Sequence, residues 1–311
     1  MRAFIFPGQG SQAVGMGNAL SEASAAAREV FGEVDEALGQ NLARLMAEGP
    51  EDELMLTENA QPAIMANAIA VLRVLETEFG VRMADKADFV AGHSLGEYSA
   101  LCAAGAIDLS TTAKLLKRRG QAMQAAVPVG EGAMAAILGA NREKAQQIAD
   151  AAAEGQVCSV ANDNDPGQVV ISGAKTAVER AVPLAREMGA KRAVLLPVSA
   201  PFHCPLMQPA AEVMETALAE AQLRAPLIPL YANVTAAPVA DPDAIRALLV
   251  EQVTGMVRWR ESVIAMAGAG VDDFVELGGK VLAAMVKRSA PDTTQNSIIT
   301  MQDIEALAKR L

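Results

Sequence analysis

The 311-residue sequence has few of the side chains that bind metal ions, because it contains only 2 histidines and 3 cysteines. Two histidines exclude a site built from three or four imidazoles, and three cysteines cannot form a Cys₄ zinc site or a framework of several disulfides. We therefore expect no metal site, and we expect the thiols to be reduced in a cytoplasmic protein. If an imidazole acts as a general base, it is His93 or His203.

Basic residues are also scarce: 26 Lys and Arg stand against 37 Asp and Glu, a formal net charge of −11. This excludes nucleic acid or an anionic membrane as a partner of the surface as a whole, so an acidic partner would need a local basic patch. No apolar run approaches the ~20 residues of a membrane span, and the N-terminal run is too short for a signal peptide. The hydrophobic content of 51% is sufficient for a core.

Short apolar runs that alternate with helical patterns predict an α/β protein with a parallel sheet. We assign this larger subdomain to residues 1–126 and 200–311. The predicted elements are strands at 3–6, 87–91 and 273–277, an apolar segment at 227–233, and helices at 59–76 and 110–126, the last with Ser110 as N-cap. The first strand ends at a glycine-rich turn, P-G-Q-G-S-Q (7–12).

The pattern changes in residues 127–199, which we predict to be a small inserted subdomain. Strands are expected at 133–139, 156–161, 168–172 and 191–198, and helices at 142–153 and 176–188, with N-D-N-D-P-G as the turn between the two middle strands. This β-α-β-β-α-β order is that of the ferredoxin-like fold.

Ser94 stands at the centre of G-H-S-L-G (92–96), directly after a predicted strand. In a nucleophile elbow the flanking glycines allow a sharp turn that exposes the serine hydroxyl, and the next backbone N–H can bind an oxyanion. The alternative is a glycine-rich helix start with a serine cap. The preceding strand favours Ser94 as a nucleophile.

A serine hydroxyl is a weak nucleophile and needs a base within hydrogen-bond reach. His93 is adjacent to Ser94 in a turn, where successive side chains diverge, so we expect it to pack or to support the site. His203 lies between two prolines just after a predicted strand and is left as the base. No Asp or Glu stands out as a third member, and a backbone carbonyl could hold the imidazole N–H instead.

Two further features indicate contacts to a substrate. Glycines in the 7–12 loop let a backbone N–H approach a ligand closely, although the loop could also be a simple strand-to-helix turn. Arg118 and Arg119 differ by about 100° around a helix, so only one is expected to face the site. A buried arginine there would suit a carboxylate, whereas both could instead lie on a solvated face.

Six motifs occur in this order: P-G-Q-G-S-Q, G-H-S-L-G-E-Y, K-R-R-G-Q-A-M-Q, N-D-N-D-P-G-Q-V-V-I-S-G, K-R-A-V-L-L-P-V-S-A-P-F-H-C and Q-V-T-G-M-V-R-W. Together, from residue 4 to about residue 288, they resemble the malonyl-CoA:acyl-carrier-protein transacylases of bacterial fatty acid synthesis. The resemblance implies an α/β-hydrolase-like large subdomain interrupted by a ferredoxin-like one.

The resemblance also implies roles for individual residues. Ser94 would attack the thioester of malonyl-CoA, and His203 would take its proton. The backbone N–H groups of Gln9 and Leu95 would form the oxyanion hole. Arg119 would bind the free malonyl carboxylate.

Three more residues match substrate-binding positions of the family. Gln252 and Asn162 match polar positions near the site, and Gln252 would also position the histidine through its backbone. Phe202 is similar to a bulky residue of malonyl-selective relatives that crowds a 2-methyl branch. One methyl changes discrimination by about 1–3 kcal/mol, so the resemblance implies a preference.

The implied reaction is ping-pong transfer of malonyl to the phosphopantetheine thiol of acyl carrier protein, with no metal or redox cofactor. The carrier is acidic in this family, and Lys175, Arg180, Lys191 and Arg192 could form its local dock. The alternative is a solvated rim.

The sequence departs from the family at two turns, where Met256 replaces a proline and Leu277-Gly278-Gly279-Lys280 replaces a G-P-G-K turn. Three other functions stay open: an esterase or thioesterase with the same elbow, an acyltransferase of a polyketide pathway, and a binding module without catalysis. The last would require a broken site.

Overall fold

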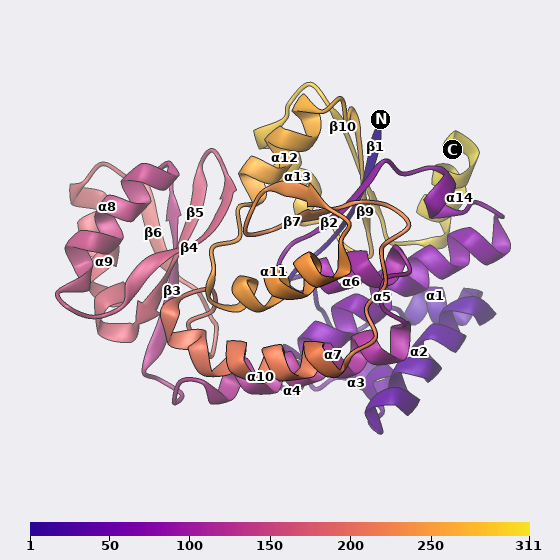
Figure 1. The fold of residues 1–311 in the computed structure, drawn as a ribbon, viewed down its shortest axis with the longest axis horizontal. Coiled ribbons are helices and arrows are strands. Elements are labelled where there is room, and N and C mark those ends of the chain that lie inside the picture. Colours follow the sequence, from indigo (N-terminus) through magenta and orange to yellow (C-terminus); the bar gives the residue numbers. More distant parts are fainter.

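The computed structural model describes all 311 residues and contains two β-sheets (Figure 1). The larger sheet has the strand order β10-β9-β1-β2-β7-β8. Its strands are β1 (Arg2–Phe6), β2 (Phe89–Gly92), β7 (Leu230–Ala232), β8 (Ala237–Val239), β9 (Asp273–Leu277) and β10 (Thr294–Ile298). All neighbours are parallel except β8, which pairs antiparallel with β7 at one edge. The predicted parallel α/β sheet is confirmed.

Strand β1 is apolar throughout because its two faces contact different cores. Phe4 and Phe6 belong to the largest buried cluster, whereas Ala3 and Ile5 pack in a second one. Parallel strands covered on both faces are apolar without alternation. The first cluster includes residues of α2 (Ala25–Leu38), α3 (Leu42–Glu48), α4 (Glu51–Met55), α5 (Thr57–Glu78), α6 (Gly96–Ala103), α7 (Leu109–Ala125), α10 (Gln208–Glu220), α11 (Pro242–Thr254) and α14 (Met301–Arg310). The second includes residues of α12 (Trp259–Gly268) and α13 (Leu282–Ser289).

Three helical segments are short: α1 (Asn18–Ala23) and two 3₁₀ turns, Met83–Asp85 and Pro205–Met207. The longest helix, α5, has 22 residues and is buried on almost every side. None of the helices combines the length and the apolar composition that crossing a membrane requires.

The smaller sheet is antiparallel and has the order β4-β5-β3-β6. It contains β3 (Gly132–Leu138), β4 (Cys158–Asp165), β5 (Gln168–Ala174) and β6 (Arg192–Leu195), with α8 (Arg142–Ala153) and α9 (Lys175–Glu187). One face packs on α8 and α9, at the left of Figure 1, while Met134, Ala136 and Val170 on the other face join the largest core. The β-α-β-β-α-β order appears as predicted, and the exact boundaries at 127 and 199 stay a prediction.

Two local predictions are wrong. The N-D-N-D segment is strand rather than turn, because β4 continues to Asp165 and only Pro166-Gly167 separate it from β5. Asp108, and not Ser110, caps α7 by accepting a hydrogen bond from the N–H of Thr111 at 2.7 Å, whereas the Ser110 hydroxyl donates to Glu33. An aspartate carboxylate is as good an N-cap as serine.

The N-D-N-D strand ties the smaller sheet to the larger one through alternating side chains. Asp163 and Asp165 are buried and pair with Arg260 of α12 and Arg288 of α13, at 2.8 and 2.7 Å. Both Asp163 oxygens accept from the Arg260 Nε at 3.0 Å. If one member of such an ion pair is removed, the other is left as a buried charge without a partner, which destabilises the folded protein.

We expect Asp163→Asn to lower the free energy of unfolding by about 1–3 kcal/mol, since it removes the charge but keeps the shape. Asp165→Asn is the matched comparison and should cost less, because Arg288 is 50% exposed whereas Arg260 is 26% exposed. Urea unfolding at neutral pH measures both. Equal stability of Asp163→Asn and the unmodified protein would contradict a structural role for this pair.

Candidate active site

Ser94 lies in a sharp turn between β2 and α6, with a backbone φ of 54°. The glycines on either side are required by close contacts. A Cβ at Gly92 would lie 1.9 Å from the carbonyl of Gly96, and one at Gly96 would lie 2.2 Å from the carbonyl oxygen of Phe6. A left-handed serine between such glycines is the geometry of a nucleophile elbow.

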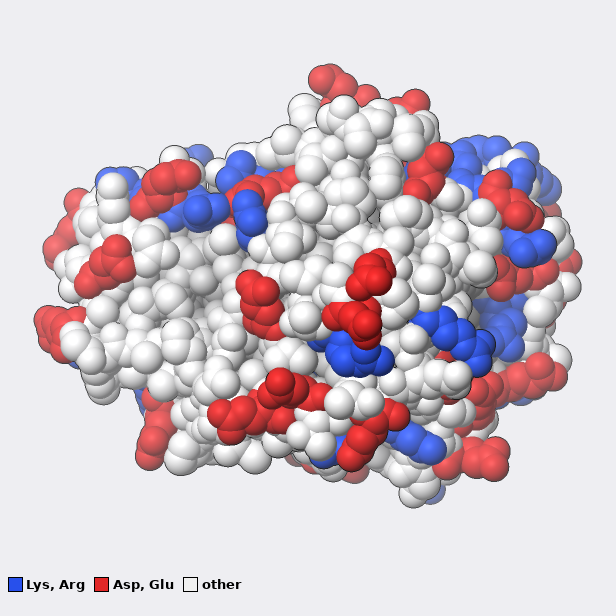
Figure 2. All heavy atoms as spheres, in the orientation of Figure 1, with Lys and Arg blue, Asp and Glu red and all other residues white.

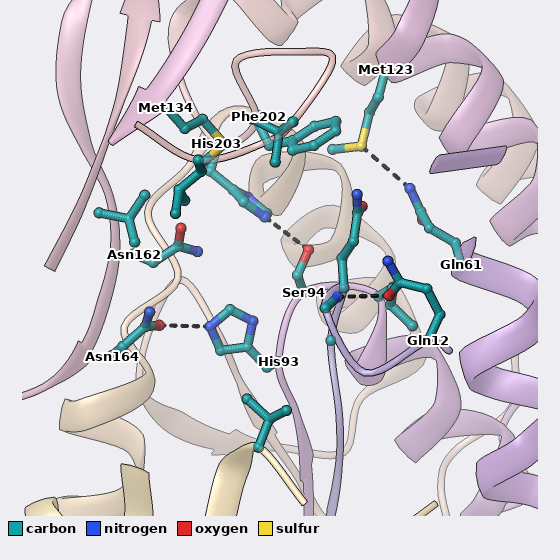
Figure 3. A pocket seen from close by; sticks show the side chains of 18 of the residues that line it. Gln12, Gln61, His93, Ser94, Met123, Met134, Asn162, Asn164, Phe202 and His203 are labelled. Carbon is teal, nitrogen blue, oxygen red and sulfur yellow. Dashed lines mark hydrogen bonds between the residues drawn. The ribbon is translucent and has the colours of Figure 1, made fainter. Parts of the chain in front are cut away.

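His203 reaches Ser94 from the loop after β6. Its Nε2 lies 2.8 Å from Ser94 Oγ (Figure 3). Its Nδ1 lies 2.8 Å from the backbone oxygen of Gln252. Because a carbonyl only accepts, Nδ1 carries the proton and Nε2 is free to accept the serine proton. A carbonyl thus takes the place of a triad carboxylate.

Burial, together with the positive charge of Arg119, lowers the pKa of His203 to about 3. The imidazole is therefore neutral, and able to act as a base, over the whole neutral range. Its position is also constrained, since its φ of 58° is unusual for a residue other than glycine.

Arg119 lies under the serine, whereas its neighbour Arg118 points to solvent. The Arg119 side chain is 1% exposed and donates from Nη2 to Ser94 Oγ at 3.1 Å. It also donates from Nη1 to Gln61 Oε1, at 2.7 Å. Arg118 is half exposed and lies 3.6 Å from Glu220. Of the two candidates, only Arg119 can meet a substrate.

Gln252 does not line the cavity, which corrects its predicted place among the substrate-binding side chains. It is fully buried behind Arg119 and His203. Its Oε1 accepts from Arg119 Nη2 at 2.7 Å, and its Nε2 donates to the Ser94 backbone oxygen at 3.0 Å. The family has a proline where this chain has Met256, yet the hydrogen bond between His203 Nδ1 and the Gln252 backbone oxygen is present.

Two backbone N–H groups beside Ser94 have no acceptor in the protein, those of Gln9 and Leu95. The Ser94 N–H, by contrast, is engaged by Asn233 Oδ1 at 2.8 Å. The Gln9 side chain is held by Thr57 Oγ1, which donates to its Oε1 at 3.0 Å. Unpaired N–H groups next to a serine are the requirement for binding an oxyanion.

A cavity of about 320 Å³ opens above the serine, between the two sheets. Its lining includes polar Gln9, Gln12, Gln61, His93, Asn162, Asn164 and Gln168, and apolar Met55, Met123, Met134, Val170, Leu196, Val198, Phe202, Val281, Leu282 and Met285. Figure 3 shows Phe202 beside His203 and Asn162 on the opposite wall. The predicted residues Asn162 and Phe202 thus face the same space as Ser94.

His93 supports this wall rather than the serine. Its Nε2 lies 2.8 Å from Asn164 Oδ1, and its ring lies 5.9 Å from that of Trp259. Burial lowers the pKa of His93, so it is neutral as well.

No three His, Cys, Asp or Glu side chains come together as a group that could hold a metal ion.

The residues predicted to dock a carrier differ in their surroundings. Arg180 binds the backbone oxygens of Ala152 and Ala153, and Lys175 lies 4.0 Å from Glu179. Lys191 and Arg192 are exposed and have no acidic partner. On the face drawn in Figure 2, acidic and basic groups are interspersed over most of the surface, and the densest group of basic side chains lies at the upper right, at the end away from the smaller sheet.

Three polar residues in the hydrogen-bond network of Ser94, Arg119 and Gln252 were not predicted: Gln61, Glu97 and Asn233. Asn233 bridges the elbow, since its Oδ1 accepts from the Ser94 N–H and its Nδ2 donates to the Gly92 oxygen at 2.7 Å. Glu97 is part of G-H-S-L-G-E-Y, and its place inside that motif was the one available signal. No local pattern marks Gln61 or Asn233.

Comparison with known proteins agrees with this geometry. The acyl transferase domain family matches residues 3–302. The chain belongs to this family. A malonyl CoA-acyl carrier protein transacylase of Bacillus subtilis is 45% identical over 97% of both chains, and one of Escherichia coli is 45% identical over 95% of both.

Solved structures of acyl transferases agree as well. The acyl-carrier-protein S-malonyltransferase of Bartonella henselae has 52% identity and a TM-score of 0.97, covering 99% of this chain and 98% of that one. A malonyl-transacylase solved in complex with a type II PKS acyl-carrier protein has 39% identity and a TM-score of 0.96, covering 100% and 99%. The resemblance to malonyl-CoA:acyl-carrier-protein transacylases is confirmed.

Proposed function

We propose that this acyltransferase moves the malonyl group from malonyl-CoA to the phosphopantetheine thiol of an acyl carrier protein and so supplies fatty acid elongation in the cytoplasm. The observation that carries the proposal is the contact between the buried Arg119 guanidinium and the Ser94 hydroxyl at 3.1 Å. A permanent cation at this distance suits an acyl group that ends in a carboxylate. The names of the relatives support the same activity.

In the first half-reaction Ser94 Oγ attacks the thioester carbonyl while its proton passes to His203 Nε2. The negative charge that forms on the carbonyl oxygen is bound by the N–H groups of Gln9 and Leu95. When the tetrahedral intermediate collapses, the carbon–sulfur bond breaks and CoA leaves with the proton from His203. The malonyl group then remains as an ester on Ser94.

The second half-reaction reverses these steps with a different thiol. His203 takes the proton of the phosphopantetheine thiol, the sulfur attacks the ester, and Ser94 regains its proton from His203. Neither half needs a metal ion or a redox cofactor. Arg119 favours transfer over hydrolysis, because an acyl group held by its carboxylate presents its carbonyl to a positioned thiol.

Phe202 and Asn162 complete the substrate site in this proposal. Phe202 restricts the space beside the acyl group and disfavours a 2-methyl branch by about 1–3 kcal/mol. Asn162 offers an amide on the opposite wall. The exposed Lys191 and Arg192 are the proposed contacts of the acidic carrier, because neither forms a salt bridge with an acidic side chain of this protein.

A polyketide carrier is the second candidate acceptor, since one similar malonyl-transacylase was solved with a type II PKS acyl-carrier protein. Competition between a fatty acid carrier and a polyketide carrier for the malonylated protein separates the two pathways.

The proposal is tested by the intact mass of the protein after exposure to malonyl-CoA and again after addition of carrier protein. We expect one malonyl group on the peptide that contains Ser94, followed by its loss to the carrier. An adduct that only hydrolyses in the presence of carrier would favour a thioesterase, and the absence of any adduct would overturn the proposal.

A further inference from the structure

Glu97 is a fully enclosed acid beneath the proposed nucleophile. It lies in the first turn of α6, three residues after Ser94, and is 1% exposed. One carboxylate oxygen accepts from the Gln252 side-chain amide, and the other accepts from the backbone N–H of Asn233 at 3.3 Å. The proposed reaction assigns no step to Glu97.

The same glutamine connects Glu97 to Arg119. Gln252 donates from Nε2 to Glu97 and accepts on Oε1 from Arg119 Nη2 at 2.7 Å. A single amide therefore lies between the carboxylate and the guanidinium. Arg119 has no Asp or Glu in direct contact.

A buried arginine needs a negative charge nearby, because burial alone disfavours its charged form. The two groups whose charges favour the protonated form of Arg119 are Tyr98 and Glu97. Burial raises the pKa of Tyr98 to about 12, so its phenol is neutral. Glu97 is left as the anion that compensates Arg119 in the empty site.

We infer that Glu97 is the counter-charge of Arg119 and that it controls how strongly the site prefers an acyl group with a free carboxylate. Glu97 touches no substrate, so it is a positioning and specificity-determining residue that acts through Gln252 and Arg119. This inference rests on the proposed malonyl transfer. When Glu97 is ionised, a substrate carboxylate at Arg119 meets a second negative charge one amide away. When Glu97 is protonated, the substrate carboxylate is the only negative charge that interacts with the Arg119 guanidinium.

The protonation state of Glu97 changes near neutral pH. Burial raises its pKa to about 7, and Arg119 is the one charged group whose field acts against this shift. The other titratable groups of the site do not interfere, since His203 has a pKa of about 3 and burial also lowers that of His93. Binding of malonyl above neutral pH is therefore expected to take up one proton, held by Glu97.

The test is the rate of Ser94 acylation in a single turnover without carrier, with malonyl-CoA and acetyl-CoA compared from pH 6 to pH 8.5. The ratio of the two rates cancels the titration of the CoA phosphates, which both substrates carry. We expect this ratio to fall about tenfold with rising pH, since two like charges this close interact by about one pKa unit or more at an effective dielectric near 20.

Glu97→Gln keeps the shape of the side chain without the charge and should hold the ratio at its low-pH value throughout. Glu251→Gln is the matched control. Glu251 precedes Gln252 in the chain, but its own side chain is exposed and makes no contact with Arg119. This variant should therefore show the same fall of the rate ratio with pH as the unmodified protein. A flat ratio in the unmodified protein, or an unchanged fall in Glu97→Gln, would overturn the inference. Absence of any malonyl-Ser94 would instead contradict the proposed function.

Discussion

Ser94→Ala is expected to abolish the malonyl adduct and to reduce transfer to the carrier by at least about 10⁴-fold, the scale found when a serine nucleophile is removed. His203 Nε2 would then have no hydroxyl at 2.8 Å, and no other hydroxyl or thiol lines the cavity. Intact-protein mass after malonyl-CoA, with a coupled assay of carrier malonylation, measures both effects.

Ser99→Ala is the control for this substitution. Ser99 lies one turn further along α6, is fully buried and has no hydrogen-bond partner for its hydroxyl. Removing an unpaired buried hydroxyl does not lower stability, so this variant should keep both the fold and the adduct. A malonyl group that persists in Ser94→Ala would identify a different nucleophile.

Arg119→Ala is expected to reduce malonyl transfer by about 10²–10⁴-fold relative to acetyl transfer, since two hydrogen bonds to a carboxylate contribute about 1.5–3 kcal/mol each. The decisive quantity is the ratio of kcat/KM for malonyl-CoA to kcat/KM for acetyl-CoA. Arg119 also contacts Ser94 and Gln252, so its loss disturbs the site for both substrates. Steady-state kcat/KM for malonyl-CoA and acetyl-CoA measures the ratio.

Arg118→Ala serves as the control, because Arg118 is adjacent in α7 but lies beside Glu220 on the surface. It should leave the ratio unchanged. If Arg119→Ala lowered kcat/KM for malonyl-CoA and for acetyl-CoA by the same factor, Arg119 would be a structural support and the carboxylate site would lie elsewhere.

Much of the catalytic core was predictable because its determinants are contiguous in the chain. The run 89–92 forms a buried strand, and the glycines at 92 and 96 permit the turn at Ser94, so the elbow follows from eight residues. His203 could be found only by elimination, since two histidines left little choice. The identity of its partner, a Gln252 carbonyl, required the structure.

The N-D-N-D segment illustrates where local prediction failed. Its composition is typical of a turn, yet β4 runs through it, and three of its four side chains have specific partners, which are His93 for Asn164 and Arg260 and Arg288 for the two aspartates. Asn162 and Asn164 line the cavity, while Asp163 and Asp165 face arginines of α12 and α13. Those arginines lie 97 and 123 residues further along the chain, beyond the reach of a local pattern.

The sequence by itself determined the class of the fold, the order of the elements, the candidate nucleophile and the family, because strand periodicity, glycine turns and motifs are properties of neighbouring residues. Only the tertiary structure decided which arginine faces the serine and which polar groups surround it. Strand β7 lies next to β2 and so brings Asn233 to Ser94, 139 residues away, while α11 brings Gln252 between Glu97 and Arg119. These contacts depend on strand order and helix packing, and they determine the charge of the site.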